Sequence, residues 1–271
     1  MKSNPVQLYY LRSKGQEGEA MKYVNVTVNH QPSSKKIVIL SLHAPHNLNA
    51  INQELYEELK QSLEEVSKDK TVGALILNSE VSNAFSAGVD LQFIQGLSNE
   101  EASNFFTKLS ELFDMLIHLS VPTISFVNGY AFGAGADLAI SCDVRIASEA
   151  AYFRFPGPQF GLVLGTQRLV NEIGSSKARF LALSGKKISG QTALEYGLVH
   201  ELCVDEETGQ KSCLKWAKIL ANVPPYTTQT IKEVCHSGES FHELTRASVL
   251  EGDFIDRFGR YVQNNKKKVR H

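Results

Sequence analysis

The chain has 271 residues, 42% of them hydrophobic and 21% charged, and its formal net charge at pH 7 is −1. A chain of this length and apolar content can bury a large core, which excludes a disordered protein. Lys and Arg are not in excess over Asp and Glu, so the charge argues against binding to a nucleic-acid backbone. No run reaches the roughly 20 apolar residues that a membrane helix needs. We therefore expect no nucleic-acid partner and no membrane partner.

The four cysteines lie far apart and form no C-x-x-C or Cys/His spacing, which argues against a zinc site or a disulfide framework. This pattern predicts a reduced, cytoplasmic protein without a metal site. Residues 1–20 are mixed polar, lack the charged-then-apolar order of a signal peptide and precede a second methionine, Met21. We expect them to form a poorly ordered N-terminal extension outside the fold.

Beyond Met21, short β-rich runs alternate with long helical patterns, which is typical of an α/β protein. A capping box at Ser98 and Glu101 predicts the start of one helix, and Gly197 is suited to end another. In chain order, we expect strands at 23–28 and 37–42, a helix at 52–68, a strand at 73–78, a helix at 98–116, strands at 123–127, 144–147 and 152–155, helices at 166–184 and 189–196, a strand at 198–204, and helices from there to about 262.

The C-terminal part of the chain differs from the rest, because no convincing strand follows Asp205. We therefore divide the chain into the extension 1–20, a core over 21–205 and an all-helical region over 206–271. Within the core, each unit of two strands and a helix resembles the next in order but not in residues. This order predicts a spiral of repeated turns.

Two glycine-containing turns each follow an expected strand and open an expected helix. The first surrounds Gly88, and the second is Gly133-Ala134-Gly135. Either turn alone can be a plain strand-to-helix connection. Glycine permits a tight turn whose free backbone N–H groups point outward at the start of the helix. Two such groups aimed at one point would form an oxyanion hole. Neither turn matches a dinucleotide fingerprint or a P-loop.

Four segments resemble, in order and spacing, the crotonase superfamily, which is the enoyl-CoA hydratase/isomerase family. They are FSAGVDL at 85–91, NGYAFGAGADLAISCDVRIAS at 128–148, GTQRL at 165–169 and SGQTALEYGLV at 189–199, preceded by the similar loop HNLNAI at 46–51. The resemblance covers about residue 23 to the C-terminus. It implies an α/β crotonase-like spiral of ββα units with an all-helical C-terminal trimerisation region. It also implies a homotrimer, or a hexamer made as a dimer of trimers.

The resemblance further implies a small-molecule acyl-CoA thioester as the substrate, with no permanently bound cofactor. The thioester carbonyl oxygen would accept the backbone N–H groups of Val89 and Ala134, which would stabilise an enolate. Ala134 stands where the family usually has glycine, a tolerable change because the donor is a backbone group. The surrounding loops are expected to bind the CoA and the substrate through Asn49, Ala50, Ser86, Ala87, Gly88, Gly133 and Gly157.

Asp137 is the expected proton-transfer residue, three positions after Ala134 in the first turn of a helix. Its alternative role is a carboxylate that complements the helix dipole. In the family's hydratases a Glu takes this position, whereas dienoyl-CoA isomerases have a similar Asp. The second family carboxylate would fall at position 157, where this chain has Gly157, and the loop before GTQRL is shorter than in typical hydratases.

Three explanations of Gly157 stay open. The enzyme, a lyase or an isomerase, can run a one-carboxylate reaction such as double-bond isomerisation. It can recruit another group, such as an anion bound near Arg154, or it can use the hole alone, as thioester decarboxylases and dihydroxynaphthoyl-CoA synthase-like members do. We favour isomerisation or another one-carboxylate reaction over standard two-Glu hydration. The rival interpretation is a catalytically silent acyl-CoA binding or scaffold protein.

Further residues carry weaker hypotheses. Arg154 either meets a substrate carboxylate or is a surface cation on a strand. The basic tail at 266–270 is either a solvated end or a contact for CoA phosphates. An RNA-binding role, known for an occasional relative, is disfavoured by the net charge. A serine-hydrolase role fails because no Ser and His lie in matching turns. The acyl pocket is expected to include Phe93, Phe132, Phe155 and Phe160.

Overall fold

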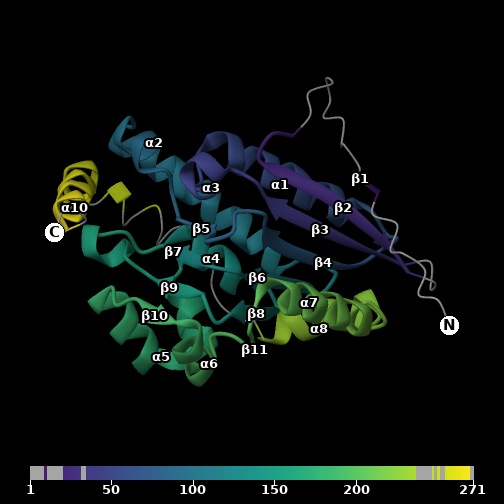
Figure 1. The fold of residues 1–271 in the computed structure, drawn as a ribbon. Coiled ribbons are helices and arrows are strands. Elements are labelled where there is room, and N and C mark those ends of the chain that lie inside the picture. Colours follow the sequence, from purple (N-terminus) through teal and green to yellow (C-terminus); the bar gives the residue numbers. More distant parts are fainter. Residues whose placement is uncertain are drawn as a thin grey trace.

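The computed structural model describes residues 9–10, 21–31, 35–235, 246, 249–250 and 254–268. These residues form two β-sheets, of which the larger is mostly parallel (Figure 1). Its pairs β1–β2 and β2–β3 are antiparallel, and every pair from β3 onward is parallel. The strand order is β1 (Tyr9–Tyr10), β2 (Val24–His30), β3 (Lys36–Leu42), β4 (Val72–Ser79), β6 (Thr123–Val127), β8 (Val144–Ser148) and β11 (Glu201–Cys203).

The smaller sheet receives one strand from each turn of the chain. Its order is β10 (Ile188–Ser189), β9 (Tyr152–Arg154), β7 (Tyr130–Phe132) and β5 (Ala84–Ser86). Along the chain β4 is followed by β5, β6 by β7 and β8 by β9, and helices lead from the smaller sheet back to the larger one. This repetition is the predicted spiral of ββα units, and it confirms the α/β fold class.

The helices begin and end close to the positions that their capping residues predict. Ser98 and Glu101 form the predicted capping box, and Gly197 ends its helix with a φ of 80°. The helices are α1 (Gln53–Lys68), α2 (Leu91–Gln95), α3 (Asn99–Ile117), α4 (Ala134–Ile140), α5 (Thr166–Ser184), α6 (Gly190–Tyr196), α7 (Glu206–Leu220), α8 (Pro225–Cys235) and α10 (Phe254–Lys268), with short 3-10 turns η1 (Pro45–Asn47) and η2 (Gly157–Phe160).

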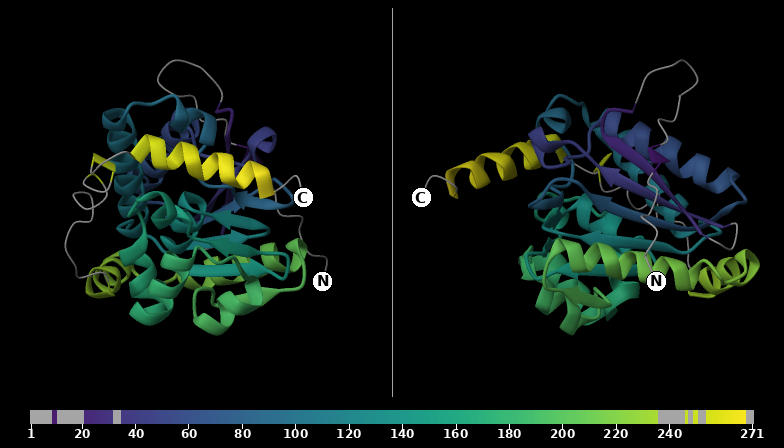
Figure 2. Two further views of the ribbon diagram at one scale, coloured as in Figure 1. Left: turned by 90° about the vertical axis from the view of Figure 1, so that its left-hand side faces the viewer. Right: turned by 45° about the vertical axis from the view of Figure 1, so that its right-hand side comes forward.

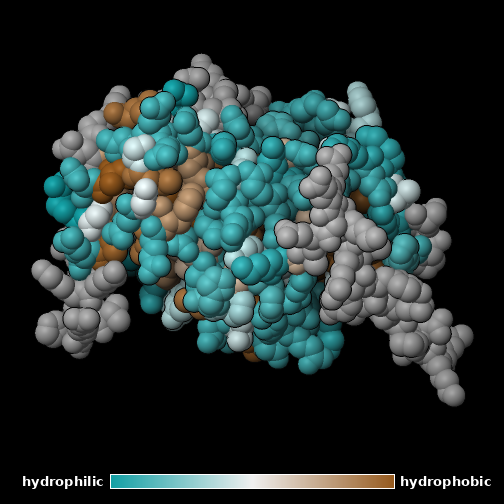
Figure 3. All heavy atoms as spheres, turned by 90° about the horizontal axis from the view of Figure 1, so that it is seen from above, coloured by the Kyte–Doolittle hydropathy of each residue, from teal (hydrophilic) through white to brown (hydrophobic). Residues whose placement is uncertain are grey.

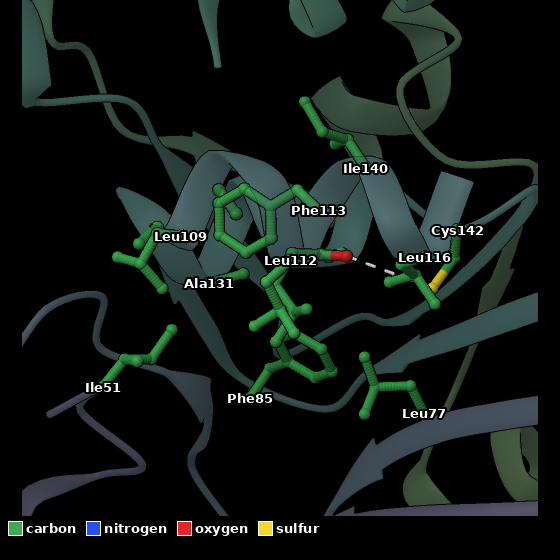
Figure 4. Packing of buried hydrophobic residues seen from close by; sticks show 14 of the residues in the cluster. Ile51, Leu77, Phe85, Leu109, Leu112, Phe113, Leu116, Ala131, Ile140 and Cys142 are labelled. Atoms are coloured by element: carbon green, nitrogen blue, oxygen red, sulfur yellow. Dashed lines mark hydrogen bonds between the residues drawn. The ribbon is translucent and has the colours of Figure 1, made fainter. Parts of the chain in front are cut away.

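Helix α3 supplies much of the main core, because its apolar residues recur at helical spacing. Figure 4 shows its side chains Leu109, Leu112 and Phe113 packed with Phe85 of β5 and Ala131 of β7. All five of these side chains are at most 2% exposed. This packing against α3 holds the strands of the smaller sheet in place, and with them the loops that follow these strands.

The helices of the expected C-terminal region pack against the core in separate places. Helix α7 packs across β4, β6 and β8 of the larger sheet. The contact is so close that a Cβ on Gly209 would lie 2.0 Å from the ring of Phe126. Helix α10 packs instead against α2, α3 and η2, at the end of the molecule away from α7 (Figures 1 and 2). Sequence pattern identified the helices but not their separate places.

Two residues of the expected N-terminal extension are part of the fold. Tyr9 and Tyr10 form β1 and pair with Val28 and Thr27 of β2, so these two residues join the larger sheet. The rest of the segment 1–20 lies outside the described residues, as do residues 269 and 270 of the basic tail. Of the helices in the described part of the chain, none has the length and apolar character that crossing a bilayer demands.

Lys232 connects α8 to the core, and replacing it should lower the free energy of unfolding. Its buried ammonium donates to the Val121 carbonyl at 3.0 Å and lies 2.8 Å from the Asp143 carboxylate. Removing the lysine takes the charged donor from the Val121 carbonyl and the counter-charge from the Asp143 carboxylate, which still accepts from Thr123. Lys232→Ala should therefore lower the free energy of unfolding by about 1.5 to 3 kcal/mol. Urea denaturation measures this, with Lys218→Ala on exposed α7 surface as the control. Equal losses in both variants would show that the buried pair adds nothing.

Candidate active site

The two glycine turns lie against each other because β5 and β7 are parallel neighbours. Gly88 has a φ of 96°, and a Cβ there would stand 2.6 Å from the Phe132 carbonyl oxygen and 3.6 Å from the Ala134 nitrogen. A Cβ on Gly135 would likewise stand 2.5 Å from the Ser86 carbonyl oxygen. Only glycine permits such an approach of two backbones. The turn at Gly88 and the turn at 133–135, which are separate in the sequence, thus form one structure.

Two backbone N–H groups remain free at this junction. Val89 forms a parallel bridge with Ile51, in which Ile51 N–H donates to the Gly88 carbonyl at 2.7 Å and Asp90 N–H donates to the Ile51 carbonyl at 2.9 Å. The N–H of Val89 itself therefore faces away from the bridge. Ala134 is the first residue of α4, so its N–H has no acceptor within the helix. Among the described residues, neither N–H donates a hydrogen bond.

Both residues line a cavity of about 790 Å³. Its lining includes polar residues from the loops before α1 and α2 and apolar side chains from η2, α3, α5 and α10. Figure 3 shows apolar surface gathered toward the side of the molecule where α2 and α10 lie, within a surface that is otherwise largely hydrophilic. The apolar part of the lining includes Phe106, Phe132, Phe155, Phe160, Leu162, Leu164, Leu169, Phe258 and Tyr261.

Asp137 also lines the cavity, from the first turn of α4. The residue is only 5% exposed, and its Oδ1 has no hydrogen-bond partner among the described residues. Burial raises the pKa of Asp137 to about 7, and the positive charge of Arg168 opposes part of that increase. A carboxyl group with this pKa can both accept and return a proton near neutral pH.

Gly165 makes room for that carboxylate. A Cβ at position 165 would lie 1.8 Å from Oδ1 of Asp137, inside the volume that the oxygen occupies. Gly165 stands directly before α5, so the start of this helix closes over the acid. The glycine of the GTQRL segment is therefore explained by contact with Asp137, a relationship that the spacing of the two segments in the sequence does not reveal.

The cavity offers one carboxylate that is not engaged elsewhere. Of the described lining residues, Asp90 and Asp137 are acidic. The Asp90 side chain caps α2 by accepting from Gln92 N–H at 2.9 Å and Phe93 N–H at 3.1 Å. Gly157 opens η2 at the wall of the cavity, where a Cβ would stand 3.1 Å from the Leu162 carbonyl oxygen. No second acid is therefore available from this turn.

Comparison with known proteins settles the family. The family model described as enoyl-CoA hydratase/isomerase matches residues 33–268. The chain belongs to this family. It is similar to the mitochondrial enoyl-CoA hydratase of Pongo abelii, at 36% identity over 85% of this chain and 78% of that protein. It is also similar to the mitochondrial methylglutaconyl-CoA hydratase of Mus musculus, at 29% identity over 88% of this chain and 78% of that protein.

The fold of the family is equally clear in solved structures. The enoyl-CoA hydratase from Bacillus anthracis superposes with a TM-score of 0.72 at 26% identity, covering 91% of this chain and 97% of that one. The predicted resemblance to the crotonase superfamily and its fold are thus confirmed. As a member of the enoyl-CoA hydratase/isomerase family, the chain is an acyl-CoA enzyme. The substrates of this family are CoA thioesters.

Most residues that the sequence assigns to the family site do line this cavity. They are Ala50, Ala87, Gly88, Val89, Gly133, Ala134, Asp137 and Gly157. Ala134 has no positive φ, so its conformation suits a residue other than glycine.

Asn49 and Ser86 differ, because they lie behind the lining. The Asn49 side chain accepts from Ala44 N–H at 2.6 Å and donates to Ser79 Oγ at 2.7 Å, and Ser86 Oγ donates to the Asn49 carbonyl at 2.7 Å. Through these hydrogen bonds, both side chains hold the loops of the site in place.

The acyl-pocket prediction holds in part and omits residues from the C-terminus. Phe132, Phe155 and Phe160 line the cavity, whereas Phe93 packs against Phe105 with ring centroids 4.9 Å apart and is outside the lining. The contribution of α10, through Phe258 and Tyr261, was not predicted. Their helical spacing was visible in the sequence, but the approach of α10 to η2 was not. In the part of the chain that the structure describes, no group of side chains is arranged to hold a metal ion.

Proposed function

We propose that the protein stabilises a thioester enolate and moves one proton with Asp137. The acyl-CoA would place its thioester carbonyl oxygen between the N–H groups of Val89 and Ala134. Asp137 would remove a proton from the carbon chain, and the electron pair left behind would become the enolate, whose oxygen accepts the two hydrogen bonds. Fixed donors of this kind stabilise the charge without rearrangement at the moment of reaction. The observation that carries the proposal is that two free N–H groups and one buried acid line the same cavity.

One acid suffices for double-bond isomerisation. The protonated Asp137 that forms in the first step can return its proton to another carbon of the same chain, so that a 3-enoyl thioester becomes a 2-enoyl thioester with no net change of atoms. Hydration requires in addition a group that activates water, and Gly157 supplies none. We therefore favour isomerisation, or another one-carboxylate reaction, over hydration with two carboxylates. No permanently bound cofactor enters this proposal.

A panel of thioesters tests the reaction. The purified protein is incubated with 2-enoyl, 3-enoyl, dienoyl and malonyl-type CoA thioesters, and each product is followed by mass and retention time. We expect an unchanged mass with a new retention time for an enoyl substrate. Gain of water would overturn the preference for isomerisation, and loss of carbon dioxide would place the enzyme with the decarboxylases. Binding of every thioester without turnover of any would support the rival, a silent acyl-CoA binder or scaffold.

The rate of the proton transfer should depend on the charge of Asp137. Because the pKa of this residue is raised to about 7, the carboxylate that accepts a proton is lost as the pH falls below that value. A plot of kcat/KM against pH should therefore rise between about pH 6 and pH 8 and level off above. The same plot for Asp137→Asn should lack this rise. A rise centred near pH 4 in the native enzyme would contradict the assignment.

We further propose that the chain assembles as a homotrimer or as a dimer of trimers. Large apolar side chains remain exposed on α5 and α8, among them Leu183 at 76% and Tyr226 at 81%. Apolar groups of this size are commonly covered in an assembly. Light scattering after size-exclusion chromatography would give the mass of the assembly.

The cytoplasmic location stays a prediction, since relatives are named both from bacteria and from mitochondria.

A further inference from the structure

Arg154 is a fixed cation at the wall of the cavity, and the mechanism above does not use it. Its Nε donates to the Gly185 carbonyl at 2.9 Å, and one terminal nitrogen donates to Gln159 Oε1 at 3.3 Å. Gln159 is itself held, because its Nε2 donates to the Ser184 carbonyl at 3.0 Å. The guanidinium is thus oriented by neutral oxygens, and no carboxylate among the described residues neutralises its positive charge.

Lack of an acidic partner distinguishes Arg154 from the buried arginines of the described chain. Arg145 pairs with Glu172, and Arg168 pairs with Asp114 at 2.7 Å. No ion pair involves Arg154 within the described residues, and its second terminal nitrogen has no hydrogen-bond partner there. A guanidinium with free, planar N–H donors matches the geometry of a carboxylate. The structure therefore offers a prepared position for an anion.

The position of Arg154 relates this anion to the reacting part of the substrate. Arg154 pairs with Phe132 in the parallel β7–β9 register, and the Gly133 N–H donates to the Arg154 carbonyl at 2.8 Å. Its side chain therefore begins beside the turn that carries Ala134. Arg154 also lines the cavity, so an anion bound to its guanidinium lies in the same cavity as the proposed thioester position.

The rest of the lining offers no equal alternative for a negative charge. Of the described lining residues, His46 and Arg154 are those that can be positively charged, and His46 is exposed on η1. Much of the rest of the lining is apolar, with Phe160, Leu162 and Phe258 among its residues. Burying a carboxylate among such residues without a partner would be unfavourable.

We propose that Arg154 binds a second carboxylate on the acyl group, so that the enzyme takes a short dicarboxylic acyl-CoA. This inference rests on the proposed function for its acyl-CoA ligand and deepens it by naming the substrate class. An anion at Arg154 has two sources in such a ligand, the acyl carboxylate and the phosphates of CoA. The acyl carboxylate is favoured because Arg154 stands next to the turn that carries Ala134. The two sources predict different effects on ligands that carry the same CoA.

Binding of saturated acyl-CoAs tests the inference without any reaction. Isothermal titration of the full chain compares glutaryl-CoA with its methyl ester and with pentanoyl-CoA. We expect glutaryl-CoA to bind on the order of 10- to 100-fold more tightly than either neutral ligand, as charge-assisted hydrogen bonds to a carboxylate would give. Equal affinity for glutaryl-CoA and its methyl ester would overturn the inference while leaving the proposed function intact. Absence of binding by every acyl-CoA would overturn both.

Substitution of Arg154 then tests whether the preference for glutaryl-CoA depends on this residue. In Arg154→Gln, the affinity for glutaryl-CoA should fall to the level of pentanoyl-CoA, and Arg154→Lys should retain part of the preference. Arg179→Gln, on an exposed face of α5 outside the cavity, should keep the full preference. A loss of affinity in Arg154→Gln that is equal for all three ligands and for free CoA would assign Arg154 to the CoA phosphates and overturn the inference. The comparison of ligands on the native protein stands even if a variant fails to fold.

Discussion

Replacing Asp137 with Asn should lower kcat/KM for the acyl-CoA reaction by about 10²- to 10⁴-fold, the usual contribution of a positioned acid or base. Asn has nearly the same shape and fits beside Gly165, but it cannot accept the substrate proton. Turnover of the most active thioester of the panel measures the loss. Asp205→Asn, at the exposed cap of α7, is the matched control and should keep full activity. Equal rates for native protein and Asp137→Asn would remove Asp137 from the mechanism.

Stability should change in the opposite direction in the same variant. Burial raises the pKa of Asp137 from 3.8 to about 7, so between these values the folded protein binds a proton that the unfolded chain has released. Stability contributed by this group therefore falls as the pH rises through that window and stays low above pH 7. Asp137→Asn lacks the penalty and should have the higher Tm at pH 8, with a smaller difference at pH 4. This result would also show that its loss of activity is not unfolding.

The rival interpretation, a silent binder, makes a different prediction for the activity measurement. Such a protein would bind acyl-CoA in the native form and in Asp137→Asn with no turnover by either. A buried carboxylate without a partner costs folding stability and is usually kept for function rather than for structure. The unpartnered Oδ1 of Asp137 thus favours an active enzyme, and the panel decides the question.

How much of this molecule could be predicted from its sequence depends on the range of the interactions involved. Local signals such as the Ser98–Glu101 capping box and the glycine at position 197 identify helix ends, because the relevant hydrogen bonds lie within one turn. Membership of the family was predicted from four motifs in order. The arrangement of α7 and α10 was not, since each packs against strands or helices far away along the chain.

The same contrast between local and long-range interactions applies to single residues of the site. Val89, Ala134 and Asp137 were expected at the site because each lies inside a motif, and all three line the cavity. Gly165 could not be related to Asp137, because the two meet only when α5 closes over α4. Asn49 was assigned to the ligand because its loop resembles a family loop, but its amide is used to hold that loop together. A motif therefore predicts which loops meet the ligand better than which side chain within the loop does so.

Replacing Gly88 with Ala should reduce kcat by about 10²- to 10³-fold, the usual cost of losing one oxyanion donor. Gly88 has a φ of 96°, and an added Cβ would stand 2.6 Å from the Phe132 carbonyl oxygen, so the turn must move. The next residue, Val89, carries one of the two N–H groups that we propose as donors, and a small displacement would remove it from hydrogen-bond range. Exchange of the α-proton of a saturated acyl-CoA in D₂O measures enolate formation directly.

Gly96→Ala is the matched control for this loss. Gly96 ends α2 with an ordinary φ of −81°, and a Cβ there would stand 3.4 Å from its nearest neighbour, the Phe93 carbonyl oxygen. That variant should exchange protons at the native rate. Acyl-CoA binding by Gly88→Ala, with an affinity near that of the native protein, would separate a lost donor from a collapsed cavity. Should Gly88→Ala form the enolate as fast as the native enzyme, the N–H of Val89 is not a donor to the thioester oxygen, and the charge must be stabilised elsewhere in the cavity.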